Sequence, residues 1–136
     1  MTFDVFLNFD GDCRSAIEFY AKVFKLEMPA NLMTYGQAPG MGMTGEAANR
    51  VLYATLPIFG CNVMFSDCPE GAPYVKGTNI ALTLGTTDAD EIGRLYAELK
   101  DGGFVNMELG QTFFSELYAM VTDRFGVTWQ ISLTTE

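Results

Sequence analysis

The chain contains the same order of elements twice, and this repeat limits its possible folds more than any other feature. Apolar and polar residues alternate over residues 3–9, which predicts a strand. Asp12 is a suitable helix N-cap, and apolar residues then recur with the i, i+3, i+4, i+7 spacing of a helix. Alternation returns over residues 79–84, followed by a cap at Asp88 and a helix that stops at residues 101–103. Both halves therefore begin with a strand and a helix.

Three further strands are predicted after each helix. They are expected at residues 26–35, 51–58 and 62–66 in the first half and at residues 104–109, 117–122 and 127–133 in the second. Each half is thus a βαβββ module, the first at about 1–68 and the second at about 77–136, with residues 69–76 as a linker inside one domain. We expect an α+β fold in which two mixed, curved sheets enclose a cleft and the helices cover the outer faces.

Composition excludes several classes of partner. The formal charge of −9 and pI near 4.3 disfavour nucleic acid and anionic membranes, so a small molecule or another protein is expected instead. The N-terminus has no secretion signal and no apolar run is long enough to span a membrane, which predicts a cytoplasmic protein. The three cysteines show no C-x-x-C spacing, so we expect reduced thiols at Cys13, Cys61 and Cys68.

One segment fits the nucleotide-binding pattern G-x-G-x-x-G. It is GMGMTG at residues 40–45. The dinucleotide fingerprint requires a buried strand directly before it and a helix opening at its end, and YGQAP precedes this segment while a strand is expected from Val51. We interpret it as a flexible loop or as a lid over the cleft. The lack of a fitting adenosine or phosphate motif also disfavours methyltransferase activity.

Several segments carry a resemblance to a known family. They are LNFDGDCRSAIEFYAKVF (7–24), VLYATLPIFGCNVMFSD (51–67), GTNIALTL (77–84) and GQTFFSELYAMVTDRFGVTWQISL (110–133). Together they resemble the vicinal oxygen chelate superfamily, in particular its PhnB-like, glyoxalase/bleomycin-resistance-like branch. The resemblance implies paired βαβββ modules and a homodimer. It leaves function open, because this fold hosts isomerases, dioxygenases, thiol transferases and drug-binding proteins. Some PhnB-like sequences bear names suggesting a demethylubiquinone methyltransferase.

The resemblance also implies where a metal would bind. Catalytic members hold an ion with His, Gln or Glu on the inner faces of four strands, and these positions correspond here to Val5, Phe65 or a neighbour, Asn79 and Gln130. None is a histidine or a carboxylate, and the chain contains no histidine at all. We therefore expect no metal site and no cofactor, with Val5, Leu7 and Phe9 forming an apolar inner side of the first strand.

Relatives often carry His and Glu at two further positions, which here are Tyr53 and Thr55. With Asn79, Tyr118 and Gln130 these hydroxyls would line a small-molecule site. Asn79 and Gln130 are either polar anchors in that site or core amides bonded to backbone groups. Glu116 would share the wall and is a weak candidate for a catalytic base, or else an exposed carboxylate at a strand end. Trp129, opposite in parity to Gln130, is expected beneath a helix.

These residues favour one function over two others. The favoured function is binding of a small, partly apolar molecule in a metal-free cleft. The main alternative is a lyase, isomerase or transferase with a non-standard site built from Glu116, Tyr53 or Cys61. A third possibility is a purely structural module whose cleft is filled by its own side chains.

Overall fold

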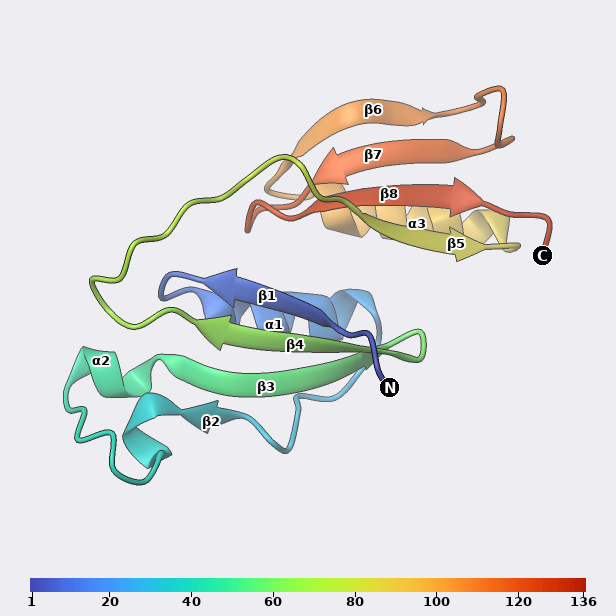
Figure 1. Ribbon diagram of the computed structural model, residues 1–136. Helices are drawn as coiled ribbons and strands as arrows, with labels where there is room; N and C mark the ends of the chain where they lie inside the picture. The colour runs from blue at the N-terminus through green and yellow to red at the C-terminus, as the bar shows by residue number, and fades with distance from the viewer. The chain divides into compact units, whose positions relative to one another are not determined.

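The computed structural model describes residues 1–136 and divides the chain into two compact units, Met1–Val75 and Lys76–Glu136. Figure 1 shows the elements of each unit. The first unit contains β1 (Val5–Phe9), α1 (Cys13–Val23), β2 (Met33–Thr34), the 3-10 helix Tyr35–Gln37, α2 (Glu46–Asn49), β3 (Val51–Ile58) and β4 (Cys61–Asp67). The second contains β5 (Leu82–Thr86), α3 (Ala89–Lys100), β6 (Phe104–Gly110), β7 (Tyr118–Thr122) and β8 (Thr128–Leu133).

The two sheets share one topology. The first has the strand order β1-β4-β3-β2 and the second has the order β5-β8-β7-β6. In each, the first strand is parallel to the last strand of the unit, and the remaining pairs are antiparallel. One long helix packs on each sheet (Figure 1). The predicted α+β class with two βαβββ modules is therefore confirmed.

Most predicted elements are present, but the segment after α1 differs. Residues 26–35 were expected to form one strand, and only Met33–Thr34 does so, paired with β3. Pro29 has no backbone N–H to donate to a strand ladder, and its carbonyl accepts instead from the N–H of Leu32 in a turn. The short helix α2 was not predicted, because four residues are too few to show helical periodicity.

The core of the first unit lies between its sheet and α1. Phe65 of β4 stacks on Phe9, with ring centroids 6.3 Å apart, and on Tyr20 of α1, with centroids 5.9 Å apart. All three side chains are at most 1% exposed. Val5 and Leu7 share the face of Phe9, because side chains two residues apart in a strand point the same way.

This packing shows that the expected inner side of the first strand was wrong. Val5, Leu7 and Phe9 face α1, whereas Phe6 and Asn8 lie on the opposite face. Apolar residues occur at both parities of this strand, and the more apolar set is the one that the helix buries. For the same reason, the positions inferred for metal ligands at Val5 and Phe65 lie on the face that α1 covers.

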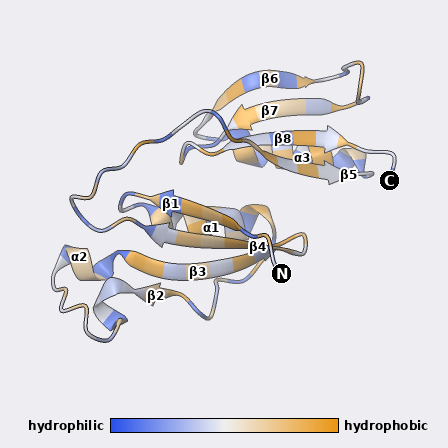
Figure 2. Cartoon of the chain, in the orientation of Figure 1, coloured by the Kyte–Doolittle hydropathy of each residue, from blue (hydrophilic) through white to orange (hydrophobic).

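The second unit has a matching core beneath α3. Ile92, Leu95 and Leu99 are the buried residues of this helix. Trp129 and Ile131 of β8 are 2% and 0% exposed, and the register places them on one face, opposite to Gln130. The predicted position of Trp129 beneath a helix is confirmed. In Figure 2, part of β7 in the same sheet has the orange colour of hydrophobic residues.

The two helix caps differ from each other. Asp88 caps α3 as predicted, since its carboxylate accepts from the N–H groups of Asp90 and Glu91. Asp12 occupies the predicted N-cap position of α1, but its side chain makes no capping hydrogen bond. The carboxylate of Asp67, 56 residues away from Gly11 along the chain, accepts from the N–H groups at the start of α1 instead.

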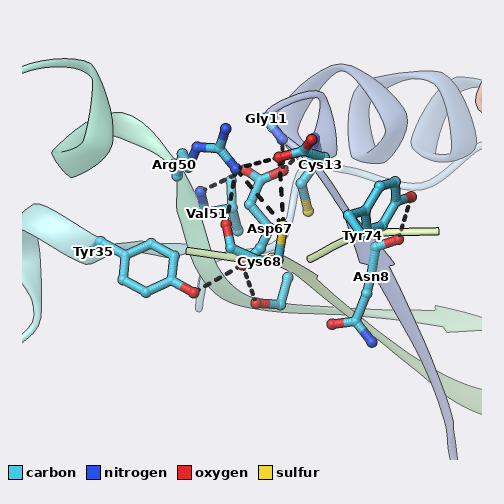
Figure 3. Close-up of polar contacts among 11 residues, drawn as sticks. Asn8, Gly11, Cys13, Tyr35, Arg50, Val51, Asp67, Cys68 and Tyr74 are labelled. Atoms are coloured by element: carbon cyan, nitrogen blue, oxygen red, sulfur yellow. Dashed lines mark hydrogen bonds and ion pairs between the residues drawn. The ribbon is translucent and has the colours of Figure 1, made fainter. Parts of the chain in front are cut away.

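Asp67 is the most heavily bonded carboxylate in the first unit. One of its oxygens accepts from Gly11 N at 2.7 Å and Cys13 N at 3.1 Å, and the other accepts from Val51 N at 2.9 Å (Figure 3). The side chain is 1% exposed. It therefore ties the end of β4 to the start of α1 and the start of β3.

Candidate functional site

The helix-free face of the second sheet, opposite to α3, carries a neutral polar pair. The Tyr118 hydroxyl donates to Gln130 Oε1 at 2.6 Å. Burial raises the pKa of the Tyr118 phenol, so it keeps its proton at neutral pH and acts as the donor. The register places Thr83 and Met120 beside Gln130 on this face. The amide oxygen of Gln130 already accepts from Tyr118, and the NH₂ group of the same amide is the part that can donate to another molecule.

A pocket of about 540 Å³ lies in the same unit, at the ends of β6, β7 and β8. Its lining consists of Thr87, Gln111, Thr112, Phe113, Phe114, Ser115, Glu116, Ser132, Leu133, Thr134 and Thr135. Glu116 is the only charged side chain among them. Ser132 shares the face of Gln130 and pairs with Tyr118, so the pocket adjoins the polar pair.

Three aromatic rings connect the pocket with this pair. The rings of Phe113 and Phe114 meet edge to face with centroids 5.1 Å apart, and those of Phe114 and Tyr118 do so at 5.0 Å. Phe113 is fully exposed and Phe114 is 58% exposed. The candidate site of this unit is therefore the polar pair, the three rings and the pocket, which we call the β7–β8 site.

The first unit carries a second polar group, on the face of its sheet opposite to α1. The Thr55 hydroxyl donates to Tyr53 Oη at 2.8 Å and accepts from Asn31 Nδ2 at 3.4 Å. Asn31 Oδ1 also accepts from the backbone N–H of Thr55 at 3.3 Å. Asn31 was missed by the sequence reasoning because it lies in the irregular segment before β2, where no periodicity shows which way a side chain points.

The six predicted binding residues are divided between the two units. Tyr53 and Thr55 lie in the first unit, whereas Tyr118, Gln130 and the nearby Glu116 belong to the β7–β8 site.

Asn79 is exposed in a bend before β5, and the predicted strand at 79–84 begins only at Leu82. Thr83 is the residue that pairs with Gln130. The alternation NIALTL has no break that marks where pairing begins, and this explains the error.

No cluster of three or more His, Cys, Asp or Glu side chains is placed to hold a metal ion. On the helix-free face of the first sheet, the residues nearest to the expected ligand positions are Phe6 and Asn8 in β1 and Met64 and Ser66 in β4. None of the residues that the register pairs on either helix-free face is His, Asp or Glu. Hydroxyls, amides and apolar groups are therefore the chemistry that these faces offer.

A charged cluster that the sequence reasoning missed lies at the carboxyl ends of β1 and β4 (Figure 3). Arg50 Nη1 lies 2.8 Å from Asp10 Oδ1 and donates to the carbonyl of Cys68 at the same distance. The Cys68 thiol donates to Asp10 at 3.4 Å. Arg50 lowers the pKa of Asp10, while burial and the bond to Asp10 raise the pKa of Cys68.

This cluster has no local signal in the sequence, because its members are 18 to 58 residues apart. Its thiol is stabilised in the protonated form and is therefore a poor nucleophile at neutral pH. Cys13 is fully buried and burial raises its pKa as well, while Cys61 is exposed. All three cysteines are free, as expected.

The G-x-G-x-x-G segment has none of the context of a dinucleotide loop. The 3-10 helix Tyr35–Gln37 precedes it rather than a buried strand. The helix that follows, α2, has only four residues and no buried side chain. Residues 40–45 are thus a connection between irregular elements, and the interpretation as a lid stays a prediction. None of the helices combines the length and the hydrophobicity that a membrane span requires.

Comparisons with known proteins agree on the family. A family model described as 3-demethylubiquinone-9 3-methyltransferase matches residues 2–132. Protein YjdN of Escherichia coli (strain K12) is 27% identical over 146 residues, which span 98% of this chain and 95% of that protein. The crystal structure of protein PA1353 from Pseudomonas aeruginosa has a TM-score of 0.87 at 28% identity, with 98% of this chain and 97% of that chain covered.

Two further solved structures are similar to this chain. A putative 3-demethylubiquinone-9 3-methyltransferase, PhnB protein, from Bacillus cereus has a TM-score of 0.82 at 25% identity, covering 98% of this chain and 100% of that chain. A glyoxylase/bleomycin resistance protein/dioxygenase domain from Frankia sp. EAN1pec shares the fold, with a TM-score of 0.65 at 13% identity, covering 98% and 96% of the two chains. The chain therefore belongs to the 3-demethylubiquinone-9 3-methyltransferase family, as a PhnB-like member of the glyoxalase/bleomycin-resistance/dioxygenase fold.

Proposed function

We propose that the protein binds a small, partly apolar molecule at the β7–β8 site without the help of a metal ion. The observation that carries the proposal is the Tyr118–Gln130 pair, which lies beside a pocket of about 540 Å³ and a wall of aromatic rings. Small-molecule sites commonly combine an apolar wall with a few fixed polar groups. Here the fixed donor is the NH₂ group of Gln130, whose amide orientation Tyr118 holds by hydrogen bonding.

The composition of the sheet faces supports binding without a metal. Hydroxyls and amides are weak ligands for a divalent ion, because neutral donors do not offset its cost of dehydration. The one G-x-G-x-x-G segment lacks the strand and helix that would position a nucleotide. We therefore do not propose the methyltransferase activity that the name of the family describes.

Metal binding gives the first test. Protein dialysed after incubation with Zn²⁺, Mn²⁺ or Ni²⁺ is expected to retain less than about 0.1 ion per chain, because no imidazole or carboxylate cluster can hold one. Elemental analysis measures the retained metal, and thermal melting with each ion provides a second readout. One ion retained per chain, together with a raised melting temperature, would overturn the metal-free part of the proposal.

Ligand binding gives the second test, with the neutral fluorophore Prodan as the probe. Prodan has an apolar naphthalene ring and a carbonyl acceptor that suits the Gln130 NH₂ group. We expect its emission to rise and shift to the blue on binding, and Gln130→Met to weaken binding about fivefold, the usual size of one lost hydrogen bond.

The matched control is Gln37→Met, which makes the same chemical change in the 3-10 helix of the first unit. This variant should bind Prodan as the parent protein does. Equal weakening by both substitutions, or no binding by the parent protein, would contradict the proposed site. Melting temperatures of the two variants separate a lost contact from a lost fold.

A further inference from the structure

The inference concerns the chemical class of the ligand and rests on the proposed function. The loop between β6 and β7, residues 111–117, presents two phenylalanine rings to solvent beside the pocket. Phe113 is fully exposed and Phe114 is 58% exposed. Leaving a large apolar side chain exposed loses roughly 1.5–3 kcal/mol of the free energy that its burial would contribute. Two adjacent exposed rings therefore indicate a contact surface.

The loop that carries these rings is held firmly by its own hydrogen bonds. Thr112 N donates to the Ser115 carbonyl at 2.9 Å, and Ser115 N donates to Thr112 Oγ1 at 3.1 Å. Ser115 Oγ lies 2.9 Å from the carbonyls of both Leu117 and Leu133, which joins the loop to β8. Because the backbone is fixed, binding a ligand against the rings needs little ordering of the loop.

The three rings meet edge to face, and the full exposure of Phe113 leaves its ring accessible to a ligand. Phe114 packs edge to face against both Phe113 and Tyr118, with interplanar angles of 88° and 80°. A flat aromatic molecule can therefore stack on an exposed phenylalanine face or meet it edge to face. The negative face of an aromatic ring also attracts a cation.

Charge determines which aromatic molecule fits best. Glu116 is the only charged residue in the pocket lining, and no lysine or arginine lines it. The whole chain carries a formal charge of −9, which attracts cations toward the surface and repels anions. We propose that the β7–β8 site is selective for flat aromatic cations, with the rings of Phe113 and Phe114 as the stacking wall and Glu116 as the counter-charge.

Three probes with one ring system test this selectivity by fluorescence titration at pH 8. They are 10-methylacridinium, which is a cation, acridine, which is neutral at this pH, and acridine-9-carboxylate, an anion. We expect the cation to bind about three- to fivefold more tightly than acridine, the range of a solvent-exposed ion pair, and the anion to bind most weakly. The preference for the cation should shrink as salt is added.

Variants separate the contribution of the Glu116 charge from that of the Phe113 ring. Glu116→Gln should weaken binding of 10-methylacridinium about three- to fivefold and change binding of acridine less than twofold. Glu27→Gln, which removes the same charge from an exposed position of the first unit, should leave both unchanged. Phe113→Leu should weaken binding of all three probes, and because this side chain is fully exposed, the variant should melt as the parent protein does.

The outcomes separate the inference from the proposed function. If acridine binds but the cation binds no better, or if its advantage survives Glu116→Gln, the charge selectivity is wrong and the binding site remains. If Phe113→Leu has no effect on any probe, the stacking wall is wrong. If none of the acridines and no Prodan bind, both the inference and the proposed function fail.

Discussion

Replacing Asp67 with alanine is expected to lower the free energy of unfolding by about 3–5 kcal/mol, the largest loss that we expect from a polar substitution in the first unit. The carboxylate accepts from Gly11 N, Cys13 N and Val51 N, and the side chain is 1% exposed. Alanine would leave these N–H groups without their acceptor, and the bonds from Cys13 N and Val51 N are buried away from water. Each unsatisfied buried group costs about 1–3 kcal/mol.

Urea unfolding followed by far-UV circular dichroism measures this loss. Asp12→Ala is the matched control, because Asp12 occupies the N-cap position of α1 but makes no capping hydrogen bond. We expect that control to change the free energy of unfolding by less than about 0.5 kcal/mol. Asp67→Asn keeps one acceptor oxygen and should fall between the two. If Asp12→Ala proved as costly as Asp67→Ala, the assignment of the cap to Asp67 would be wrong.

Gly103→Ala is expected to lower the free energy of unfolding by about 3 kcal/mol or more, because there is no room for a methyl group. A Cβ at this position would lie 2.1 Å from the Thr122 carbonyl oxygen and 2.8 Å from the Asp123 carbonyl carbon. Both are backbone atoms, so neither can rotate away. Relief would require β6 to move away from β7 where Phe104 pairs with Thr122.

Gly93→Ala in α3 is the control, and its effect should have the opposite sign. A Cβ there meets no atom within 4 Å, and alanine is the better helix former by about 0.5–1 kcal/mol. Urea titrations of the two variants should therefore move the unfolding midpoint in opposite directions. A midpoint for Gly103→Ala close to that of the parent protein would show that the two strands can separate at little cost.

These glycines illustrate what can be learned from local sequence. Residues 101–103 predicted the end of a helix, and α3 does end at Lys100. The same letters could not show that Gly103 also allows two strands to approach each other, because Thr122 is 19 residues further along the chain. Asp12 and Asp67 show the same difference, since Asp12 has the right residue type at the N-cap position while the acceptor comes from β4.

The residues of the candidate sites also differ in whether local sequence could predict them. Tyr118 and Gln130 were predicted to share a wall, because alternation along a strand gives the direction of each side chain. The structure joins them by a hydrogen bond. Asn79 was placed in the strand by the same rule and lies in a bend before it. Asn31 and the Asp10–Arg50–Cys68 cluster were not predicted, since contacts across 18 to 58 residues leave no periodic signal.

Periodicity and residue chemistry are properties of short segments, and they were enough to predict the repeated βαβββ plan, the two long helices and the scarcity of metal-binding side chains. Three features became clear only in the folded chain: the side of β1 that faces α1, the residue at which β5 begins, and the carboxylate that accepts from the start of α1. The physical reason is that each of these choices depends on burial and pairing with a distant segment. Of the two sets of side chains on β1, the one that buries more apolar surface packs against α1. No local pattern in the sequence shows which set that is.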